Sequence, residues 1–398
     1  MKKVLALLLV VLLVVGMFAG CRNTEEEAPV EPSPQPDVID NGDDEPGEEG
    51  DWIIGVITGT VTQNEEEFQA GRQMQERFGA DRVLHVTYPD RFNDEIETTI
   101  TQVMSLVDNG AQAVIMCQAV PGTIASIQRL REQYPDVLFI AVTIQEPPRE
   151  IAYWADVVLQ ADDIGMGTAI MEQAYAMGAE VFVHYSFPRH LAVEMIAQRR
   201  SLLVETAERL GIEFIDVMAP DPTGADGPAG AQQFIIEDVP RQVAEHGVNT
   251  AFFSTNCIMQ EPLIRSVIEQ GALYPQPCCP SPYHAFPGAL NIAVPPGYEG
   301  NVAFMLEQIT EAVAAAGMTG RLANWPVPVN MLGIEVGVLY AIEFLEGRTN
   351  GRMDPEAILA TLNRVAAGFG VTVNVSNMED EEGVIENMFL IISDSYEF

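Results

Sequence analysis

The chain has 398 residues, and its 58 acidic residues outnumber its 20 basic ones, which gives a formal net charge of −38. Lys2 and Lys3 are its only lysines, so a chain that has lost its first twenty residues cannot use a Schiff-base lysine or a phosphate-binding-loop lysine. Nucleic acid and anionic lipid surfaces are also excluded as partners of so acidic a protein, because both kinds of binding neutralise phosphate groups with basic side chains.

The first twenty residues have the parts of a secretory signal. A basic start is followed by an apolar run at residues 4–15 and by small residues up to position 20. This run is too short for a stable membrane-spanning helix. Residues 18–21, Phe-Ala-Gly-Cys, resemble the bacterial lipobox, which implies cleavage before Cys21 and attachment of diacylglycerol to its thiol. The alternative is an ordinary secretory signal followed by a coincidental cysteine.

An acidic segment follows the lipobox. Residues 22–50 contain 11 acidic residues, five prolines and almost no large apolar side chain. Such a segment repels itself and has nothing to bury, so residues 21–50 are expected to be a lipidated cysteine with a disordered tether. The folded part would then be held at the extracytoplasmic face of the cell membrane.

From residue 52 onward, short apolar runs alternate with segments of helical period. The first series has expected strands at 52–58, 83–87, 113–117 and 137–142, and helices at 64–78, 93–107 and 123–134. The first of these helices has Asn64 as its cap and Glu67 three residues later, as in a capping box. A second series has strands near 156–160, 181–183, 214–217 and 250–255, with helices at 168–177, 190–210, 234–246 and 261–270.

This pattern predicts an α/β protein. Continuous apolar strands that alternate with amphipathic helices are typical of parallel sheets covered on both faces. Two such series of similar size predict two doubly wound parallel-sheet lobes joined by a hinge. Ligands of open α/β sheets bind beyond the carboxyl ends of the strands, so a cleft between the lobes is the expected binding site.

Several stretches, in order, resemble the type I periplasmic solute-binding proteins, the superfamily of ribose-binding proteins and repressor cores. They are residues 110–115, residues 162–167 with the apolar helix after them, Arg199 in its long helix, residues 252–256, and residues 325–347. Gln112 and Cys257 replace the aspartates of the family pattern, so the chain resembles a remote branch, a lipoprotein family of unassigned function. The resemblance implies a first lobe of 51–161 plus about 296–348, and a second of 162–295 plus about 349–398.

A small polar ligand held between two lobes needs donors and acceptors at strand ends, with aromatic rings for stacking. Arg199 is a candidate from the resemblance, and because arginine is the only permanent cation of the mature chain. The candidate ligand-binding residues are Thr58, Tyr88, Gln118, Thr143, Asp162, Arg199, Asn256, Tyr283 and His284. Each has a structural alternative: the threonines as turn caps, Tyr88 as packing, Asp162 as a helix cap, and Arg199 in an ion pair on its own helix.

Enzyme and metal chemistry find little support in the sequence. No glycine-rich dinucleotide loop, nucleophile elbow or His-x-x-x-His pair occurs. Cys278 and Cys279 lack the second pair that a metal site of that spacing requires, so we expect no metal and no cofactor. A bond from Cys257 to Cys278 or Cys279 within one lobe is the one plausible disulfide, and free thiols are the alternative.

These features together predict a lipid-anchored solute-binding protein, monomeric and without enzymatic activity. It would close around a small polar ligand and deliver that ligand to the membrane permease of an ABC-type importer. A surface sensor that does not take part in transport would use the same residues. A lipoprotein enzyme is a third hypothesis, and it would need a carboxylate pair or an activated nucleophile in the cleft.

Overall fold

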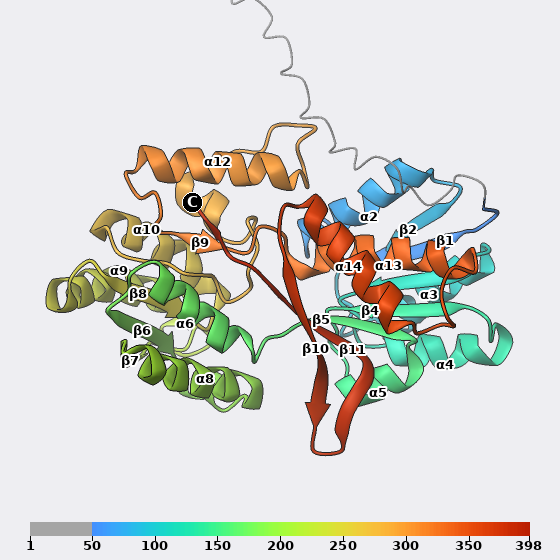
Figure 1. Ribbon diagram of the computed structural model, residues 1–398, viewed down its shortest axis with the longest axis horizontal. Coiled ribbons are helices and arrows are strands. Elements are labelled where there is room, and N and C mark those ends of the chain that lie inside the picture. Colours follow the sequence, from blue (N-terminus) through green and yellow to red (C-terminus); the bar gives the residue numbers. More distant parts are fainter. Residues whose placement is uncertain (1–49) are drawn as a thin grey trace, which may run out of the picture. The chain divides into compact units, whose positions relative to one another are not determined.

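The computed structural model describes residues 50–398, which contain two parallel sheets (Figure 1). The expected signal sequence, the lipidated Cys21 and nearly all of the acidic tether lie outside the described residues. Within residues 50–398, no helix combines the length and the apolar character needed to cross a membrane.

The larger sheet has seven strands and a helical layer on each face. Its strand order is β10-β11-β5-β4-β3-β1-β2, with all neighbours parallel except the antiparallel pair β10 and β11. The first five strands are β1 (Ile54–Thr58), β2 (Val83–Thr87), β3 (Ala113–Cys117), β4 (Leu138–Val142) and β5 (Val157–Ala161). Most of their side chains are buried, which is why these segments are apolar without alternation.

Two sets of helices cover this sheet. One set packs against Ile57, Val114 and Met116 and consists of α3 (Ile96–Asp108), α4 (Thr123–Gln133) and α5 (Pro148–Trp154). The other packs against Ile54 and Ile115 and consists of α2 (Glu65–Phe78), α13 (Val329–Leu345) and α14 (Pro355–Gly368). We call this sheet with its helices the first lobe.

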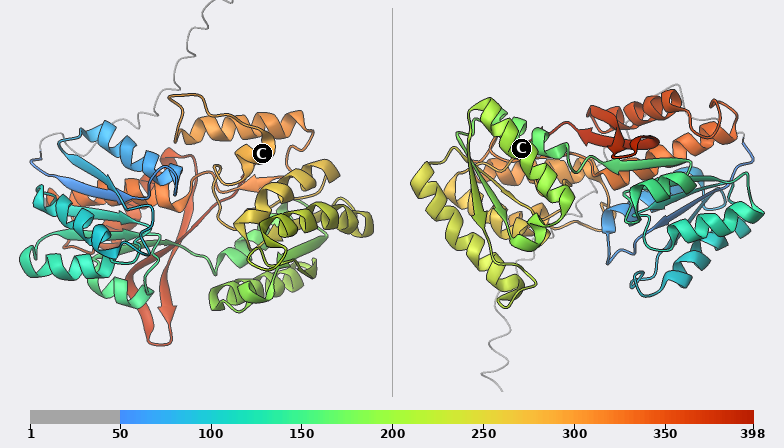
Figure 2. Two further views of the ribbon diagram at one scale, coloured as in Figure 1. Left: turned by 180° about the vertical axis from the view of Figure 1, so that it is seen from behind. Right: turned by 90° about the horizontal axis from the view of Figure 1, so that it is seen from below.

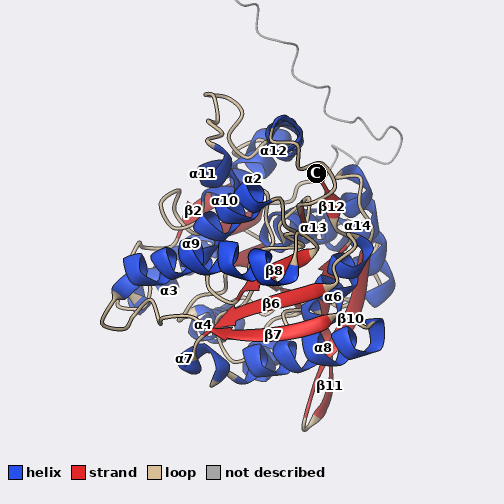
Figure 3. Ribbon diagram, turned by 90° about the vertical axis from the view of Figure 1, so that its left-hand side faces the viewer, coloured by secondary structure: helices blue, strands red, loops and turns tan. Residues whose placement is uncertain are grey.

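The smaller sheet forms the second lobe. Its parallel order is β7 (Glu213–Met218), β6 (Val181–Ser186), β8 (Thr250–Ser254), and Figure 3 shows these strands side by side. Phe253 faces α6 (Met166–Ala176) and α8 (Glu194–Leu210). Phe252, its neighbour in the strand, points the other way, into a core that includes α9 (Gly227–His246), α10 (Gln260–Gln270), α11 (Phe286–Leu290) and α12 (Val302–Ala315). The predicted fold class, two doubly wound α/β lobes, is confirmed.

The C-terminal part of the chain is distributed differently from the expectation. Helix α12 belongs to the core of the second lobe, so the chain returns to the first lobe near Trp325 and not near Pro295. The last 50 residues do not join the second lobe as expected. Strands β10 (Val373–Asp380) and β11 (Gly383–Ser393) extend the first sheet, because β11 pairs in parallel with β5.

Only the last residues return to the second lobe. There β12 (Tyr396–Glu397) pairs with β9 (Ala323–Asn324), and Phe398 is buried in the second core. The chain thus crosses between the lobes three times within the described residues. The turn that joins β10 and β11 extends beyond the neighbouring helices in Figure 1 and in the left view of Figure 2.

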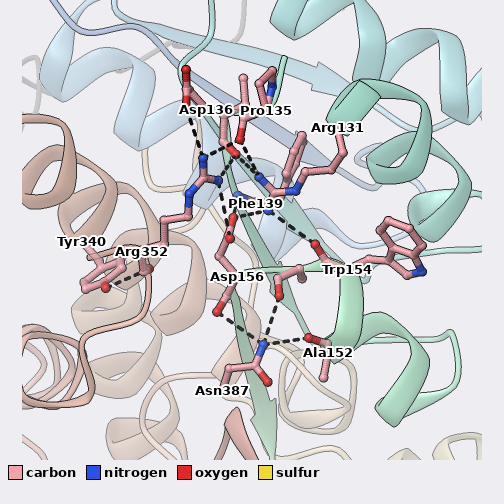
Figure 4. Close-up of polar contacts among 12 residues, drawn as sticks. Arg131, Pro135, Asp136, Phe139, Ala152, Trp154, Asp156, Tyr340, Arg352 and Asn387 are labelled. Atoms are coloured by element: carbon pink, nitrogen blue, oxygen red, sulfur yellow. Dashed lines mark hydrogen bonds and ion pairs between the residues drawn. The ribbon is translucent and has the colours of Figure 1, made fainter. Parts of the chain in front are cut away.

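A polar network fastens the C-terminal segment to the first lobe (Figure 4). The side-chain amide of Asn387 in β11 donates to the carbonyl oxygens of Ala152 at 2.8 Å and Ala155 at 3.0 Å, both at the end of α5. Arg131 and Arg352 both donate to the carbonyl oxygen of Val137, at 2.7 Å and 2.9 Å. These bonds give side-chain donors to carbonyl groups at the end of α5 and just before β4.

Helix α13 lies directly on the first sheet. It contacts β3, β4 and β5, and its side chains are buried along most of its length. Gly333 and Gly337 face the sheet, where a methyl group would come within 2.4 Å of Val142 and 2.9 Å of Ile115, respectively. The absence of side chains at these two positions lets the helix backbone approach the strands closely.

Candidate functional site

A cavity of about 600 Å³ lies where the carboxyl ends of β3, β4 and β5 meet the start of α2. Its wall includes segments from both lobes: the first turn of α2, the residues after the strands, the loop at 279–284, and the crossing at 325–330. The position agrees with the rule that ligands of parallel α/β sheets bind beyond the carboxyl ends of the strands.

The N-terminus of α2 supplies a buried carboxylate. Asn64 caps the helix by accepting a hydrogen bond from the Glu67 backbone N–H, as predicted. The Glu67 side chain does not complete a capping box. It turns toward the strand ends, where it accepts from the Gly59 N–H at 2.5 Å and from Gln118 Nε2 at 2.9 Å. Burial raises the pKa of Glu67, while these hydrogen bonds act in the opposite direction.

Glu66 connects three segments around the cavity. It accepts hydrogen bonds from the Ser281 hydroxyl of the second lobe and, at 3.0 Å, from Asn330 Nδ2 at the start of α13. Burial raises its pKa as well. The bond between Glu66 and Ser281 is a direct polar contact between the lobes, next to the cavity.

The strand ends carry a row of amides on strained backbone. Gln145 Nε2 donates to Gln118 Oε1 at 2.7 Å, and the Gln118 N–H donates to Thr143 Oγ1 at 3.3 Å. Three residues here have positive φ angles: Gln118 at 64°, Ala119 at 31° and Thr143 at 48°. For the β-branched Thr143 this conformation is costly, and strain of this kind concentrates at binding and catalytic sites.

Three aromatic side chains bring unpaired polar atoms to the cavity wall. Tyr283 Oη, Trp325 Nε1 and His284 Nε2 are buried, and none has a hydrogen-bond partner within the described residues. A buried polar group without a partner costs roughly 1–3 kcal/mol. A ligand that paired with these atoms would recover that cost.

The cavity is acidic. Its lining contains the carboxylates of Glu65, Glu66, Glu67 and Asp163, and the residues of the described chain that line it include no arginine or lysine. Amides, hydroxyls and carboxylates suit a neutral polyhydroxylated molecule or a cation, and they disfavour an anion.

Four of the nine candidate ligand-binding residues line this cavity: Gln118, Thr143, Tyr283 and His284. The other five lie outside it. Thr58 hydrogen-bonds to His85 Nε2 at 2.8 Å inside the first lobe, and Tyr88 is buried in the core of that lobe. Ligand contact by the four lining residues stays a prediction.

Asp162, Arg199 and Asn256 have structural roles. Asp162 accepts from the Gly165 N–H at 2.7 Å just before α6, and Asn256 caps the turn at Cys257–Met259 by accepting from the Ile258 N–H. Arg199 is 4% exposed, with its guanidinium 5.6 Å from the centre of the Phe253 ring. The residues that directly follow Asp162 and Asn256 in the chain, Asp163 and Cys257, line the cavity instead.

Sequence reasoning missed the acidic first turn of α2 and the crossing at 325–330. A helix N-terminus that directly follows the first strand of a parallel sheet is a recognised ligand position, so the acids after Asn64 were an available signal. The segment 325–330 reaches the cavity only because the chain crosses between the lobes there, and no local pattern indicates such a crossing.

Comparisons with known proteins identify a family and several relatives that this chain resembles. The model of the family described as "Protein of unknown function (DUF3798)" matches residues 52–323. An uncharacterized protein of Treponema pallidum (strain Nichols) is 31% identical over 181 residues, which are 44% of this chain and 82% of that protein. A second uncharacterized protein of the same strain is 30% identical over 166 residues, 42% of this chain and 77% of its own length.

Two solved structures show the same fold. The crystal structure of a putative transcriptional regulator from Clostridium difficile 630 has a TM-score of 0.80 at 22% identity and covers 87% of this chain and 99% of its own. A sugar ABC transporter structure from Actinomyces odontolyticus has a TM-score of 0.50 at 10% identity and covers 75% and 85%. The resemblance to type I periplasmic solute-binding proteins is thus confirmed at the level of fold, and the chain belongs to the family described as "Protein of unknown function (DUF3798)".

Proposed function

We propose that this protein is an extracytoplasmic solute-binding protein whose lobes close around a small polar ligand that is neutral or cationic. The observation that carries the proposal is the pair of unpaired buried groups, Tyr283 Oη and Trp325 Nε1, on the wall of one 600 Å³ cavity. Both are amphipathic aromatic groups, which stack on a ligand through the ring and orient it through the polar atom.

The charge of the cavity narrows the class of ligand. We expected Arg199 to hold a carboxylate, a phosphate or a pair of hydroxyls of the ligand, but Arg199 lies outside the cavity and four carboxylates line the wall. A sugar, a nucleoside or an amine matches this lining, and a volume of 600 Å³ is within the range of small-molecule sites.

Ligand binding would be coupled to closure of the two lobes. Ligand groups that contact the strand ends of the first lobe and Tyr283 of the second at the same time stabilise only the closed state. The hydrogen bond from Ser281 to Glu66 joins the same two lobes beside the cavity and would stabilise the closed state.

We further propose that Cys21 carries a lipid anchor and that the closed protein delivers its ligand to an ABC-type importer. The support is the lipobox-like sequence ahead of a fold shared with a sugar ABC transporter structure. Replacement Cys21→Ala should abolish fatty-acid labelling and membrane partitioning in cells. A variant that still carries lipid would refute the anchor.

The ligand proposal is tested by a thermal-shift screen of the mature protein against sugars, nucleosides, amino acids and polyamines, followed by calorimetry on each hit. Tyr283→Phe should leave the ligand-free protein at least as stable as the parent, because it removes a buried hydroxyl that bonds to nothing in the described chain. The same change should lower the affinity for the ligand by about 5- to 100-fold, which is the usual contribution of one buried hydrogen bond.

Tyr153→Phe is the matched control, since Tyr153 is 79% exposed and does not line the cavity. Its affinity for the ligand should equal that of the parent. If both Tyr283→Phe and Gln118→Ala bind a hit with the affinity of the parent, that molecule binds elsewhere. This result would count against the cavity as the binding site.

A further inference from the structure

Three thiols and an imidazole meet at one wall of the cavity. Cys257 follows β8, whereas Cys278, Cys279 and His284 belong to the loop after α10. The Cys257 sulfur lies 3.4 Å from the Cys278 sulfur and 3.6 Å from the Cys279 sulfur, and the last two are 3.9 Å apart. One nitrogen of His284 and the sulfurs of Cys257 and Cys278 all lie within 4.8 Å of one another.

From this geometry we propose that Cys257, Cys278, Cys279 and His284 form a site for a thiophilic divalent metal ion of the Zn²⁺ class. Sulfur atoms about 2.3 Å from a tetrahedral zinc ion are about 3.8 Å from one another. The three sulfur distances fall close to that value, whereas a disulfide bond would require about 2.05 Å. Three thiolates and one imidazole are a common zinc ligand set.

The histidine adds a second, independent observation. The buried Nε2 atom of His284 has no hydrogen-bond partner within the described residues. An imidazole nitrogen without a partner is costly to bury, and a metal ion would satisfy it. From the sequence we expected no metal here, because Cys278 and Cys279 lack a second cysteine pair, but the fold supplies Cys257 and His284 in its place.

The surrounding backbone holds the cluster in position. Asn256 caps the turn that carries Cys257, and prolines at 277, 280 and 282 surround the other two cysteines. The His284 N–H donates to the Ser281 carbonyl oxygen at 3.1 Å, and Ala285 adopts a φ of 64°. A ligand set that is ordered in advance loses less entropy when it binds an ion.

All four ligands belong to the second lobe, so a bound ion would not lock the lobes together. Cys257, Cys279 and His284 also line the cavity, so the ion would lie at its wall. Each ligating thiol gives up its proton to solvent when the metal binds, and one ion therefore releases up to three protons. The proposal does not depend on the identity of the solute.

The test uses the mature protein, reduced and freed of metal by a chelator, and Co²⁺ as a spectroscopic probe. One equivalent of Co²⁺ should release protons and produce thiolate charge-transfer absorption with the intense ligand-field bands of a tetrahedral ion. One equivalent of Zn²⁺ should then displace the Co²⁺ without further proton release. Absence of charge-transfer absorption in the reduced protein would overturn the site. A Cys257–Cys278 disulfide in the isolated protein, with no metal uptake after reduction, would also overturn it.

Variants separate direct ligands from neighbours. Cys279→Ser changes an exposed thiol, and His284→Gln changes a partly buried side chain, so both should fold, as circular dichroism would verify. Each variant should lower the affinity for Co²⁺ by at least about 100-fold. Loss of a residue that only hydrogen-bonds to a metal ligand costs up to about 100-fold, and loss of the ligand itself should cost at least as much. Cys117→Ala and His246→Gln are the matched controls and should bind Co²⁺ like the parent. Equal affinity in all four variants would refute the assignment.

Discussion

The contact between α13 and β4 offers a quantitative test of the packing that holds the first lobe together. In Gly333→Ala, the new methyl carbon would lie 2.4 Å from Val142 Cγ1, 3.4 Å from Cγ2 and 3.5 Å from Cβ. The first distance is far inside van der Waals contact, whereas the other two are close to normal. The side chain of Val142 alone therefore creates the conflict, and its removal should relieve it.

The magnitudes follow from the type of each change. Overpacking a buried site costs about 1–3 kcal/mol, and the 2.4 Å contact with Val142 favours the upper part of that range, about 2–3 kcal/mol. Alanine gains about 1 kcal/mol over glycine in a helix, so Gly333→Ala should destabilise the protein by about 1–2 kcal/mol. Val142→Ala removes two buried methyl groups and leaves a cavity, at a cost of about 2–3 kcal/mol. In the double variant the new methyl fills that cavity, so its cost should be about 1 kcal/mol instead of the additive value of about 4 kcal/mol.

Denaturant unfolding followed by tryptophan fluorescence measures these free energies. Trp52 and Trp154 belong to the first lobe and Trp325 lies at the crossing into it, so the signal reports on the lobe that is changed. We expect a coupling free energy of about 3 kcal/mol between positions 142 and 333. Additive costs, within about 0.5 kcal/mol, would show that α13 is not packed on β4 as described.

Three further changes test other parts of the fold. Burial, with the charge of a nearby arginine, lowers the pKa of His85 to about 4, so the unfolded chain binds a proton that the native state does not as pH falls from about 6.5 to 4. The parent should therefore lose up to about 3 kcal/mol over that range relative to His85→Gln, and parallel pH profiles of the two proteins would contradict this. Asn387→Ala should cost about 1–3 kcal/mol in denaturant unfolding because two carbonyl groups at the end of α5 lose their donor, and Asn387→Asp should cost more; the reverse order would refute the donor role. Gly167→Ala places a methyl group 2.4 Å from the backbone oxygen of Arg199, which cannot rotate away, so a melting temperature equal to that of the parent would disprove the close packing of α6 on α8.

The amino-acid sequence by itself determined most of the order of strands and helices up to α10. Each apolar strand, each amphipathic helix and the cap at Asn64 depend on residues within a few positions of one another, so local patterns are sufficient to predict them. The fold class follows from the same alternation, whereas the resemblance to solute-binding proteins depends on an ordered set of short stretches such as residues 162–167 and 252–256. Three details differ: α5 was not expected, α9 begins at Gly227 and not at residue 234, and the expected helix at 190–210 is interrupted between α7 (Pro188–Leu191) and α8.

Only the tertiary structure decided which lobe the C-terminal elements join and which side chains line the cavity. Helical periodicity shows that α12 buries one face, but it does not show against which sheet, and the pairing of β11 with β5 joins residues more than 200 positions apart. Two of the candidate residues lie outside the cavity for a related reason. Asp162 and Asn256 are one position away from the residues that line the cavity, because their side chains cap the turns that aim Asp163 and Cys257. Likewise, the cysteine cluster depends on bringing Cys257 to Cys278, a distance that sequence spacing cannot reveal and that packing within the second lobe sets.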